Sequence, residues 1–240
     1  MYSNRDRLII FDVDGTIIDA FSAISQTFLK HGMELGDLER FQKRHNLLKY
    51  LGGIKEFPFN LKKQIGKQSR KRLLSTLTDA YREEASLYPG IADLLRTLIA
   101  SSGVRVGLVT RNITNEPELT IRKLLARHDI DGEELDFVIH VPLGQDKTTA
   151  FRAIRRSFDI NPARSYACGD EHQDYVSAVT ASMHCFMVSY GFEDYSRLTK
   201  KFDIPADVIS RTPGEFCGRV LHAFDIEHRE SSQYRSIESI

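Results

Sequence analysis

The chain has 240 residues, of which 41% are hydrophobic and 28% charged, as is ordinary for one large globular domain or a core with a smaller insertion. Its 33 Lys and Arg residues equal its 33 Asp and Glu residues, so net charge favours neither nucleic acid nor membrane as a partner. No apolar run approaches the roughly 18 residues of a membrane span, and no signal peptide is visible. Three cysteines without metal or redox spacing predict buried small hydrophobes in a cytoplasmic protein.

The first predicted element is a strand over residues 8–11, which ends in the motif D-V-D-G-T of residues 12–16. Four consecutive apolar residues bounded by turn formers indicate a strand buried on both faces. Asp12 and Asp14 point to the same side of an extended chain, and Gly15 permits a sharp exit. Because converging carboxylates repel each other, the pair favours a hard divalent metal. An Asp-Gly turn that merely ends a strand is the alternative.

A helix is predicted over residues 17–30, where apolar residues recur at spacings of three and four. Residues 41–82 remain helix-like, and Gly52-Gly53 and Pro58 divide them into short helices. Between residues 43 and 72, ten Lys or Arg residues accompany a single acid, Glu56. This basic block is a solvated helix face or a surface that steers a phosphorylated substrate. Nucleic-acid binding is a weaker alternative because few aromatic residues are interleaved.

After Pro89-Gly90 the pattern changes to alternating helices and strands. Helices are predicted over residues 91–100, 119–125, 147–158, 176–181 and 214–224. Strands are predicted over residues 104–109, 137–141, 165–168, 185–188 and 206–209. This alternation predicts an α/β fold with a doubly wound parallel sheet. The tail from residue 230 is polar and is expected to fray.

Polar residues follow the predicted strands at the ends where such sheets bind ligands. Thr110 ends the second strand, Asp170 follows a later one, and Asp174 lies one helical turn further on. Lys147 opens the helix between them. Each of these residues also has an ordinary structural interpretation when it is considered alone. Thr110 would be a helix N-cap, Lys147 a surface lysine and Asp174 an acid in the first turn of a helix. Their order at successive strand ends, together with Asp12 and Asp14, favours one shared site.

These residue types suit phosphoryl transfer. One carboxylate can accept the phosphoryl group as an aspartyl-phosphate, and a second can protonate the leaving oxygen and then activate water. Mg²⁺ requires oxygen ligands, which Asp12, Asp170 and Asp174 can supply. A hydroxyl and a lysine can hold the remaining phosphoryl oxygens.

On these motifs, the sequence resembles the haloacid dehalogenase superfamily, in its phosphoglycolate-phosphatase-like branch with a helical cap. The resemblance extends to about Gly191. It implies that Asp12 is the nucleophile and that Asp14 is the general acid/base, which also offers its backbone carbonyl to magnesium. Thr110 corresponds to the family's second motif and Lys147 to its third.

The fourth motif of the family, G-D-x-x-x-D, corresponds to residues 169–174. The implied metal ligands are Asp12, Asp14, Asp170 and Asp174. The implied phosphate-binding set is Thr110, Arg111, Asn112 and Lys147. The sequence departs from the family in Thr148, where a proline often follows the lysine, and in Arg111, which is bulkier than the residue often found there and is a candidate substrate contact.

The resemblance also implies a domain division. Residues 1–20 and 87–240 form the catalytic core, and residues 21–86 form an inserted helical cap that chooses the substrate. The expected function is a Mg²⁺-dependent phosphatase acting on a small phosphorylated metabolite, phosphoglycolate-like or a sugar phosphate. A phosphomutase, a phosphonate hydrolase with a Schiff-base lysine such as Lys55, and a non-catalytic phosphometabolite-binding protein are the alternatives.

Overall fold

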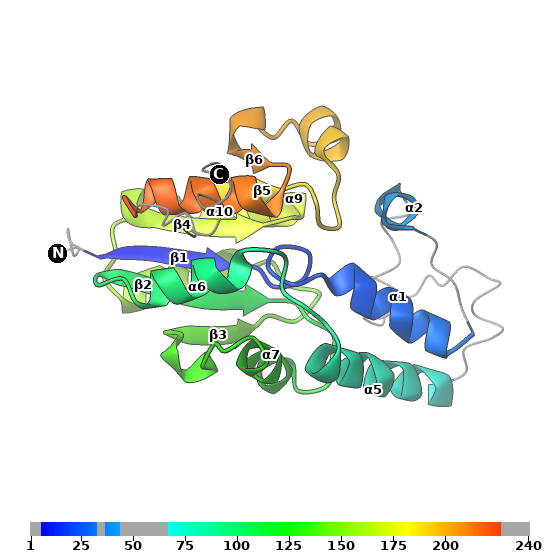
Figure 1. The fold of residues 1–240 in the computed structure, drawn as a ribbon. Helices are drawn as coiled ribbons and strands as arrows, with labels where there is room; N and C mark the ends of the chain where they lie inside the picture. Colours follow the sequence, from blue (N-terminus) through cyan, green and yellow to red (C-terminus); the bar gives the residue numbers. More distant parts are fainter. Residues whose placement is uncertain (1–5, 33–36, 44–66, 227–240) are drawn as a thin grey trace, which may run out of the picture.

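The computed structural model describes residues 6–32, 37–43 and 67–226 (Figure 1). Its centre is one parallel sheet of six strands in the order β3-β2-β1-β4-β5-β6. The strands are β1 (Arg7–Phe11), β2 (Val104–Thr110), β3 (Phe137–His140), β4 (Ser165–Gly169), β5 (His184–Val188) and β6 (Ile209–Ser210). The α/β class and the parallel sheet predicted from the alternation of elements are therefore confirmed.

Helices connect the strands and cover the sheet (Figure 1). They are α1 (Ala20–Lys30), α2 (Leu38–Lys43), α5 (Lys67–Glu83), α6 (Ile91–Ile99), α7 (Pro117–Ala126), α8 (Thr148–Ser157), α9 (His172–Thr180) and α10 (Pro213–Ala223). Short 3₁₀ turns occupy Gly132–Glu134, Pro162–Arg164 and Ala206–Val208, and a π-helical turn spans Arg197–Lys201.

Strand β1 lies at the centre of the sheet and is buried on both faces, as its four apolar residues predict. Ile9 and Phe11 pack in one core cluster with residues of α6, α7 and α10. Leu8 and Ile10 point to the opposite face and pack with residues of α8 and α9. This alternation follows from the two-residue period of a strand and places two hydrophobic layers around β1.

The strand order brings three strand ends together. β1 pairs in parallel with β2 on one side and with β4 on the other. The chain proceeds from β1 through β2 to β3 and then crosses back to β4, so the order reverses beside β1. In open α/β sheets, ligands bind at the carboxyl ends of strands at such a switch point. The residues that follow β1, β2 and β4 therefore share one edge of the sheet.

Three helix starts differ from the sequence prediction by two or more residues. Helix α1 begins at Ala20 rather than residue 17, because the Asp19 carboxylate caps it by accepting a 3.1 Å hydrogen bond from the Ser22 amide. Helix α7 begins earlier than predicted, at Pro117, whose fixed φ suits a first helical position. Helix α9 also begins earlier, at His172, because a capping box of Glu171 and Asp174 holds its first turn.

One predicted strand is largely wrong. Residues 206–208 form a 3₁₀ turn, and only Ile209–Ser210 pair with β5. The residues after Pro205 are as apolar as those of a short edge strand. Hydrophobic periodicity therefore could not distinguish the 3₁₀ turn from a strand.

The elements described between residues 20 and 83 are the helices α1, α2 and α5, which agrees with a helical insertion. α1 and α5 pack against each other beyond the carboxyl end of the sheet (Figure 1). The C-terminal part of α5 also contacts α7, where Arg82 lies 3.1 Å from Glu116. Gly52-Gly53, Pro58, Lys55 and most of the basic block lie outside the described residues.

Cys168, Cys185 and Cys217 are buried and carry free thiols, which confirms their prediction as small core hydrophobes. Among the described helices, none combines the length and apolar character needed to cross a membrane.

The packing of α6 leads to a first prediction. Leu95 is fully buried in the core under this helix, whereas Leu29 on α1 is 63% exposed. Leu95→Ala is expected to lower the free energy of unfolding by about 3 kcal/mol, because it removes buried methyl groups and leaves a cavity. Leu29→Ala, the same chemical change at the surface, is expected to stay within about 0.5 kcal/mol of wild type. Urea denaturation measures both, and equal losses would contradict this account of the core.

Candidate active site

Asp12 follows β1 directly, and its amide donates a 2.9 Å hydrogen bond to the Cys168 carbonyl of β4. The chain then turns back on itself, with the Gly15 amide bonded to the Ile18 carbonyl at 3.0 Å. Gly15 has a left-handed φ of 79°, and a Cβ at this position would collide with the Asp170 carboxylate. Glycine is therefore required twice, by the backbone conformation and by the close approach of Asp170.

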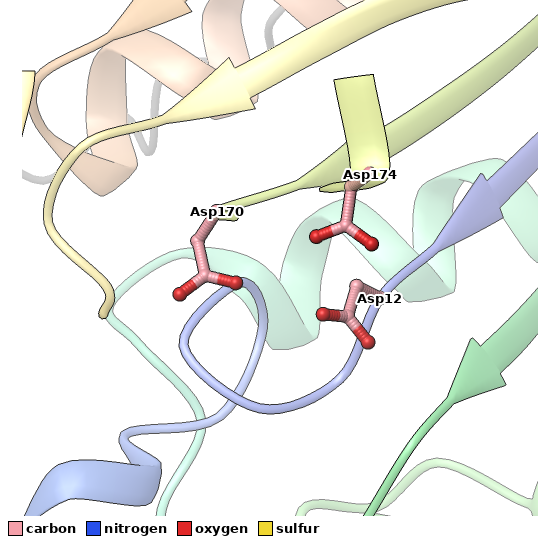
Figure 2. Close-up of side chains that lie close together, drawn as sticks. All are labelled: Asp12, Asp170 and Asp174. Carbon is pink, nitrogen blue, oxygen red and sulfur yellow. The ribbon is translucent and has the colours of Figure 1, made fainter. Parts of the chain in front are cut away.

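Three carboxylates from two strand ends and a helix converge beside this turn. Asp12 follows β1, Asp170 follows β4, and Asp174 lies in the first turn of α9. Figure 2 shows the three side chains lying close together. One oxygen of each lies within 4.8 Å of the others, and all three residues are buried. The sequence prediction that these acids share one site is thus matched by their positions.

Lys147 supplies a buried positive charge to this cluster. It is the N-cap residue of α8, and its side chain is 2% exposed. Its Nζ atom lies 2.7 Å from Asp12 Oδ1 and 2.8 Å from Asp174 Oδ1. The alternative of a surface lysine is therefore wrong. A charge buried this deeply needs ionic partners, and Lys147 has two.

The other end of the cluster is held mainly by the backbone. Asp170 Oδ2 accepts a 2.6 Å hydrogen bond from the Phe192 amide, and Oδ1 lies 3.4 Å from the Thr16 hydroxyl. The Glu171 amide donates to Asp174 Oδ2 at 3.2 Å as part of the capping box of α9. Gly169 leaves room for the Asp174 side chain, which fills the place of its missing Cβ.

The cluster carries more negative than positive charge among the described residues. Asp12, Asp170 and Asp174 face one ammonium, that of Lys147, because the nearby Arg111 guanidinium is paired with Glu171. Burial raises the pKa of Asp12 to about 7, although Lys147 opposes the shift. Burial and the neighbouring carboxylates raise the pKa of Asp170 well above its usual range. A set of buried carboxylate oxygens in need of positive charge fits a hard divalent cation such as Mg²⁺.

Asp14, the second acid of the first motif, lies apart from this cluster and is held by side chains. The Asn112 amide nitrogen donates to both carboxylate oxygens, at 3.0 and 2.9 Å. The Tyr81 hydroxyl donates to Oδ1 at 2.8 Å. Burial raises the pKa of Asp14, and the hydrogen bonds from Tyr81 and Asn112 oppose the increase.

Thr110, Arg111 and Asn112 reach the site from the end of β2. Thr110 is fully buried, and its hydroxyl accepts a 3.0 Å hydrogen bond from the Asn112 amide. It is not a helix N-cap, because α7 begins only at Pro117. The Arg111 guanidinium pairs with Glu171 at 2.7 Å. All eight predicted site residues therefore lie at this edge, with Asn112 bonded to Asp14 and Arg111 to Glu171.

Two residues that hold side chains of the site, Tyr81 and Glu171, were not predicted from the sequence. Tyr81 continues the apolar stripe of Leu73 and Leu77 on α5 at a helical spacing, so the sequence marks it as a core aromatic. Glu171 follows Asp170 without any motif of its own. No spacing rule could predict the pairing of Tyr81 with Asp14 or of Glu171 with Arg111, because these partners are 67 and 60 positions apart in sequence.

The arrangement defines a class of protein, an α/β fold with a polar site at the carboxyl edge of a parallel sheet. The sequence model described as haloacid dehalogenase-like hydrolase matches residues 9–188. The chain therefore belongs to the haloacid dehalogenase-like hydrolase family.

Curated relatives narrow the class. A phosphoglycolate phosphatase of Pseudomonas putida is 29% identical over 205 residues, which cover 78% of this chain and 70% of that protein. Phosphoglycolate phosphatase 1 of Pseudomonas aeruginosa is 25% identical over 202 residues, with the same coverage. Because it belongs to this hydrolase family and is similar to these phosphatases, the chain is an enzyme of the phosphatase type.

Solved structures agree with the fold. A haloacid dehalogenase-like hydrolase from Streptococcus pneumoniae superposes with a TM-score of 0.61 at 18% identity, covering 92% of this chain and 100% of that one. A predicted phosphatase from Clostridium acetobutylicum gives a TM-score of 0.57 at 19% identity, covering 90% and 99%. At these identities the likeness concerns the fold alone.

The close approach at Gly15 can be tested against a matched glycine. Gly90 has a similar φ of 82°, but a Cβ there would meet only Cys217 Sγ, at an ordinary 3.5 Å. Gly90→Ala is expected to lower the free energy of unfolding by about 1 kcal/mol, the approximate cost of a left-handed alanine. Gly15→Ala is expected to lose at least about 2 kcal/mol more, because Asp170 must move. If urea denaturation gave equal losses of unfolding free energy for the two variants, the Asp170 side chain would be able to move aside without cost.

Proposed function

We propose that this protein is a Mg²⁺-dependent phosphatase that hydrolyses a small phosphorylated metabolite through an aspartyl-phosphate on Asp12. The observation that carries the proposal is the buried group of Asp12, Lys147 and Asp174, with Asp170 beside it. It combines a carboxylate nucleophile, a fixed cation and further carboxylate ligands at one strand edge. Phosphoryl transfer depends mainly on such positioning and charge stabilisation.

In the first step, a carboxylate oxygen of Asp12 forms a bond to phosphorus while the bond from phosphorus to the ester oxygen breaks. Lys147 holds Asp12 Oδ1 at 2.7 Å, which fixes the orientation of the carboxylate. In the second step, water attacks the phosphorus of the acyl phosphate and releases inorganic phosphate. Asp12 is thereby regenerated, and the atoms balance as one ester and one water giving an alcohol and phosphate.

Asp14 is the proposed general acid/base. It gives its proton to the departing ester oxygen in the first step and takes one from water in the second. Both roles require a carboxyl group held in one orientation. Asn112 and Tyr81 provide hydrogen bonds that suit this requirement.

The phosphoryl oxygens are proposed to contact residues at the ends of β2 and α8. The Thr110 hydroxyl and the Lys147 ammonium are the principal candidates, and Arg111 and Asn112 complete the proposed phosphate-binding set. Fixed donors aimed at an oxygen that gains charge in the transition state lower the barrier without reorganising at the moment of reaction.

Asp12, Asp170 and Asp174 would hold the divalent cation, together with the backbone carbonyl of Asp14. When bound, Mg²⁺ would neutralise charge on the phosphoryl group and help to orient it. The excess of buried carboxylates over cations among the described residues supports this assignment.

The substrate is proposed to be phosphoglycolate-like or a sugar phosphate. The curated relatives are named as phosphoglycolate phosphatases, so phosphoglycolate is the first substrate to test. We further propose the core as residues 1–20 and 87–240, the cap as residues 21–86, and the cytoplasm as the site of action. The free, buried thiols suit a reducing compartment.

The nucleophile can be tested with a panel of phosphorylated metabolites, assayed for phosphate release with and without Mg²⁺. Asp12→Asn is expected to reduce turnover by roughly three orders of magnitude or more, because it removes the ionised nucleophile. The matched control is Asp93→Asn, since the Asp93 side chain is 83% exposed and its loss leaves the site intact. Near-normal release by Asp12→Asn would overturn the mechanism, and isomerised sugar phosphate without free phosphate would indicate a mutase.

The metal site can be tested without turnover. Mg²⁺ is expected to raise the melting temperature of wild type, because a ligand at about 100 times its Kd stabilises by about 2.7 kcal/mol. Asp170→Asn removes one anionic ligand and is expected to abolish most of that increase. Differential scanning fluorimetry with and without Mg²⁺ measures the effect, and Asp93→Asn again serves as control. A full increase in Asp170→Asn would exclude Asp170 as a ligand.

A further inference from the structure

Tyr81 is a buried tyrosine with its polar end in the active site. It lies near the C-terminal end of α5 and is 2% exposed. Its ring belongs to the core cluster that includes Leu73 and Leu77, and its hydroxyl donates a 2.8 Å hydrogen bond to Asp14 Oδ1. The side chain therefore joins the hydrophobic interior of α5 to the second acid of the first motif.

The hydrogen bond from Tyr81 is one part of a clamp on the Asp14 carboxylate. Asn112 contacts both oxygens of that carboxylate from the opposite element, the end of β2. Its own amide is fixed, because its Oδ1 accepts hydrogen bonds from the Thr114 amide, at 2.9 Å, and from the Thr114 hydroxyl. Two side chains from separate elements thus restrict rotation of one carboxylate.

Helix α5 is anchored to the loop that carries Asn112 and to the start of α7, which follows that loop. The Thr78 hydroxyl accepts a 2.9 Å hydrogen bond from the Asn115 amide. Arg82 donates to the Thr120 hydroxyl at 3.1 Å and pairs with Glu116. Tyr81 lies between these two anchors on the helix. Its hydroxyl is therefore held in register with Asn112, and the contact with Asp14 is part of a fixed arrangement.

We infer that Tyr81 is a positioning residue that orients the Asp14 carboxyl group for proton transfer to the leaving oxygen. The inference rests on the proposed function, since it takes Asp14 as the general acid/base. Without the hydroxyl, Asn112 alone would hold the carboxylate, which could then rotate away from the ester oxygen. Because Tyr81 belongs to the proposed cap segment, the acid/base of the core is held partly from outside the core.

The test uses Tyr81→Phe, which keeps the buried ring and removes only the hydroxyl. Wild type, Tyr81→Phe and Asp14→Asn are compared on 4-nitrophenyl phosphate and phenyl phosphate with Mg²⁺. Nitrophenolate leaves without a proton, whereas the more basic phenolate needs one, so general-acid assistance matters mainly for phenyl phosphate. The control is Tyr166→Phe, because Tyr166 lies near the amino end of β4 and stacks on Phe186.

We expect Tyr81→Phe to lower kcat/KM about tenfold on phenyl phosphate and no more than about twofold on 4-nitrophenyl phosphate. This ratio reports only the steps up to departure of the leaving group, so the later role of Asp14 as a base does not enter it. Asp14→Asn should show the same preference more strongly, and Tyr166→Phe should match wild type on both substrates. Equal losses on the two substrates, or no loss on either, would overturn the role of Tyr81.

The pattern of results separates this inference from the proposed function. If Asp14→Asn discriminates between the leaving groups and Tyr81→Phe does not, only the positioning role fails. If wild type hydrolyses neither ester, or Asp14→Asn shows no leaving-group preference, the proposed role of Asp14 fails and the inference fails with it.

Discussion

The site depends on one buried ammonium group shared by two carboxylates. Lys147 connects Asp12, at the end of the central strand, to Asp174, in the first turn of α9. Burying a charge costs several kcal/mol unless its partners are well placed. The positions of β1, of the start of α8 and of the start of α9 are therefore interdependent, because a shift of any one would leave a buried charge unpaired.

Much of the fold follows from hydrophobic pattern. The central strand was predictable because residues 8–11 are all apolar, and the alternation after Pro89-Gly90 indicated the parallel sheet. The pattern failed where the chain is governed by local hydrogen bonds. The start of α9 depends on reciprocal bonds between Glu171 and Asp174, and the residues before β6 form a 3₁₀ turn of the same apolar content as a strand.

The site residues that could be predicted from the sequence are mainly those at the ends of strands. Asp12, Thr110 and Asp170 could be placed together because the carboxyl ends of neighbouring parallel strands meet at one edge. Their hydrogen-bond partners could not be foreseen. Asn112 reaches Asp14, and Tyr81 reaches it from α5, through contacts between residues 98 and 67 positions apart in sequence. The helical spacing of Tyr81 predicts a buried core residue, and its ring does lie in the hydrophobic core.

The two acids of the first motif are held by different means, and the difference follows from their place in the chain. Asp12 continues the ladder of β1, because its backbone amide donates a hydrogen bond to the Cys168 carbonyl. The sheet itself therefore fixes its backbone. Asp14 lies beyond the strand, directly before the turn that Gly15 begins, where its backbone forms an isolated bridge with Ile18 rather than a strand ladder. Its carboxylate is oriented by side chains instead. In the proposed mechanism, the rigidity of the sheet would hold the Asp12 nucleophile at one point relative to phosphorus. The proposed proton donor, Asp14, is instead held by side chains from α5 and from the loop after β2.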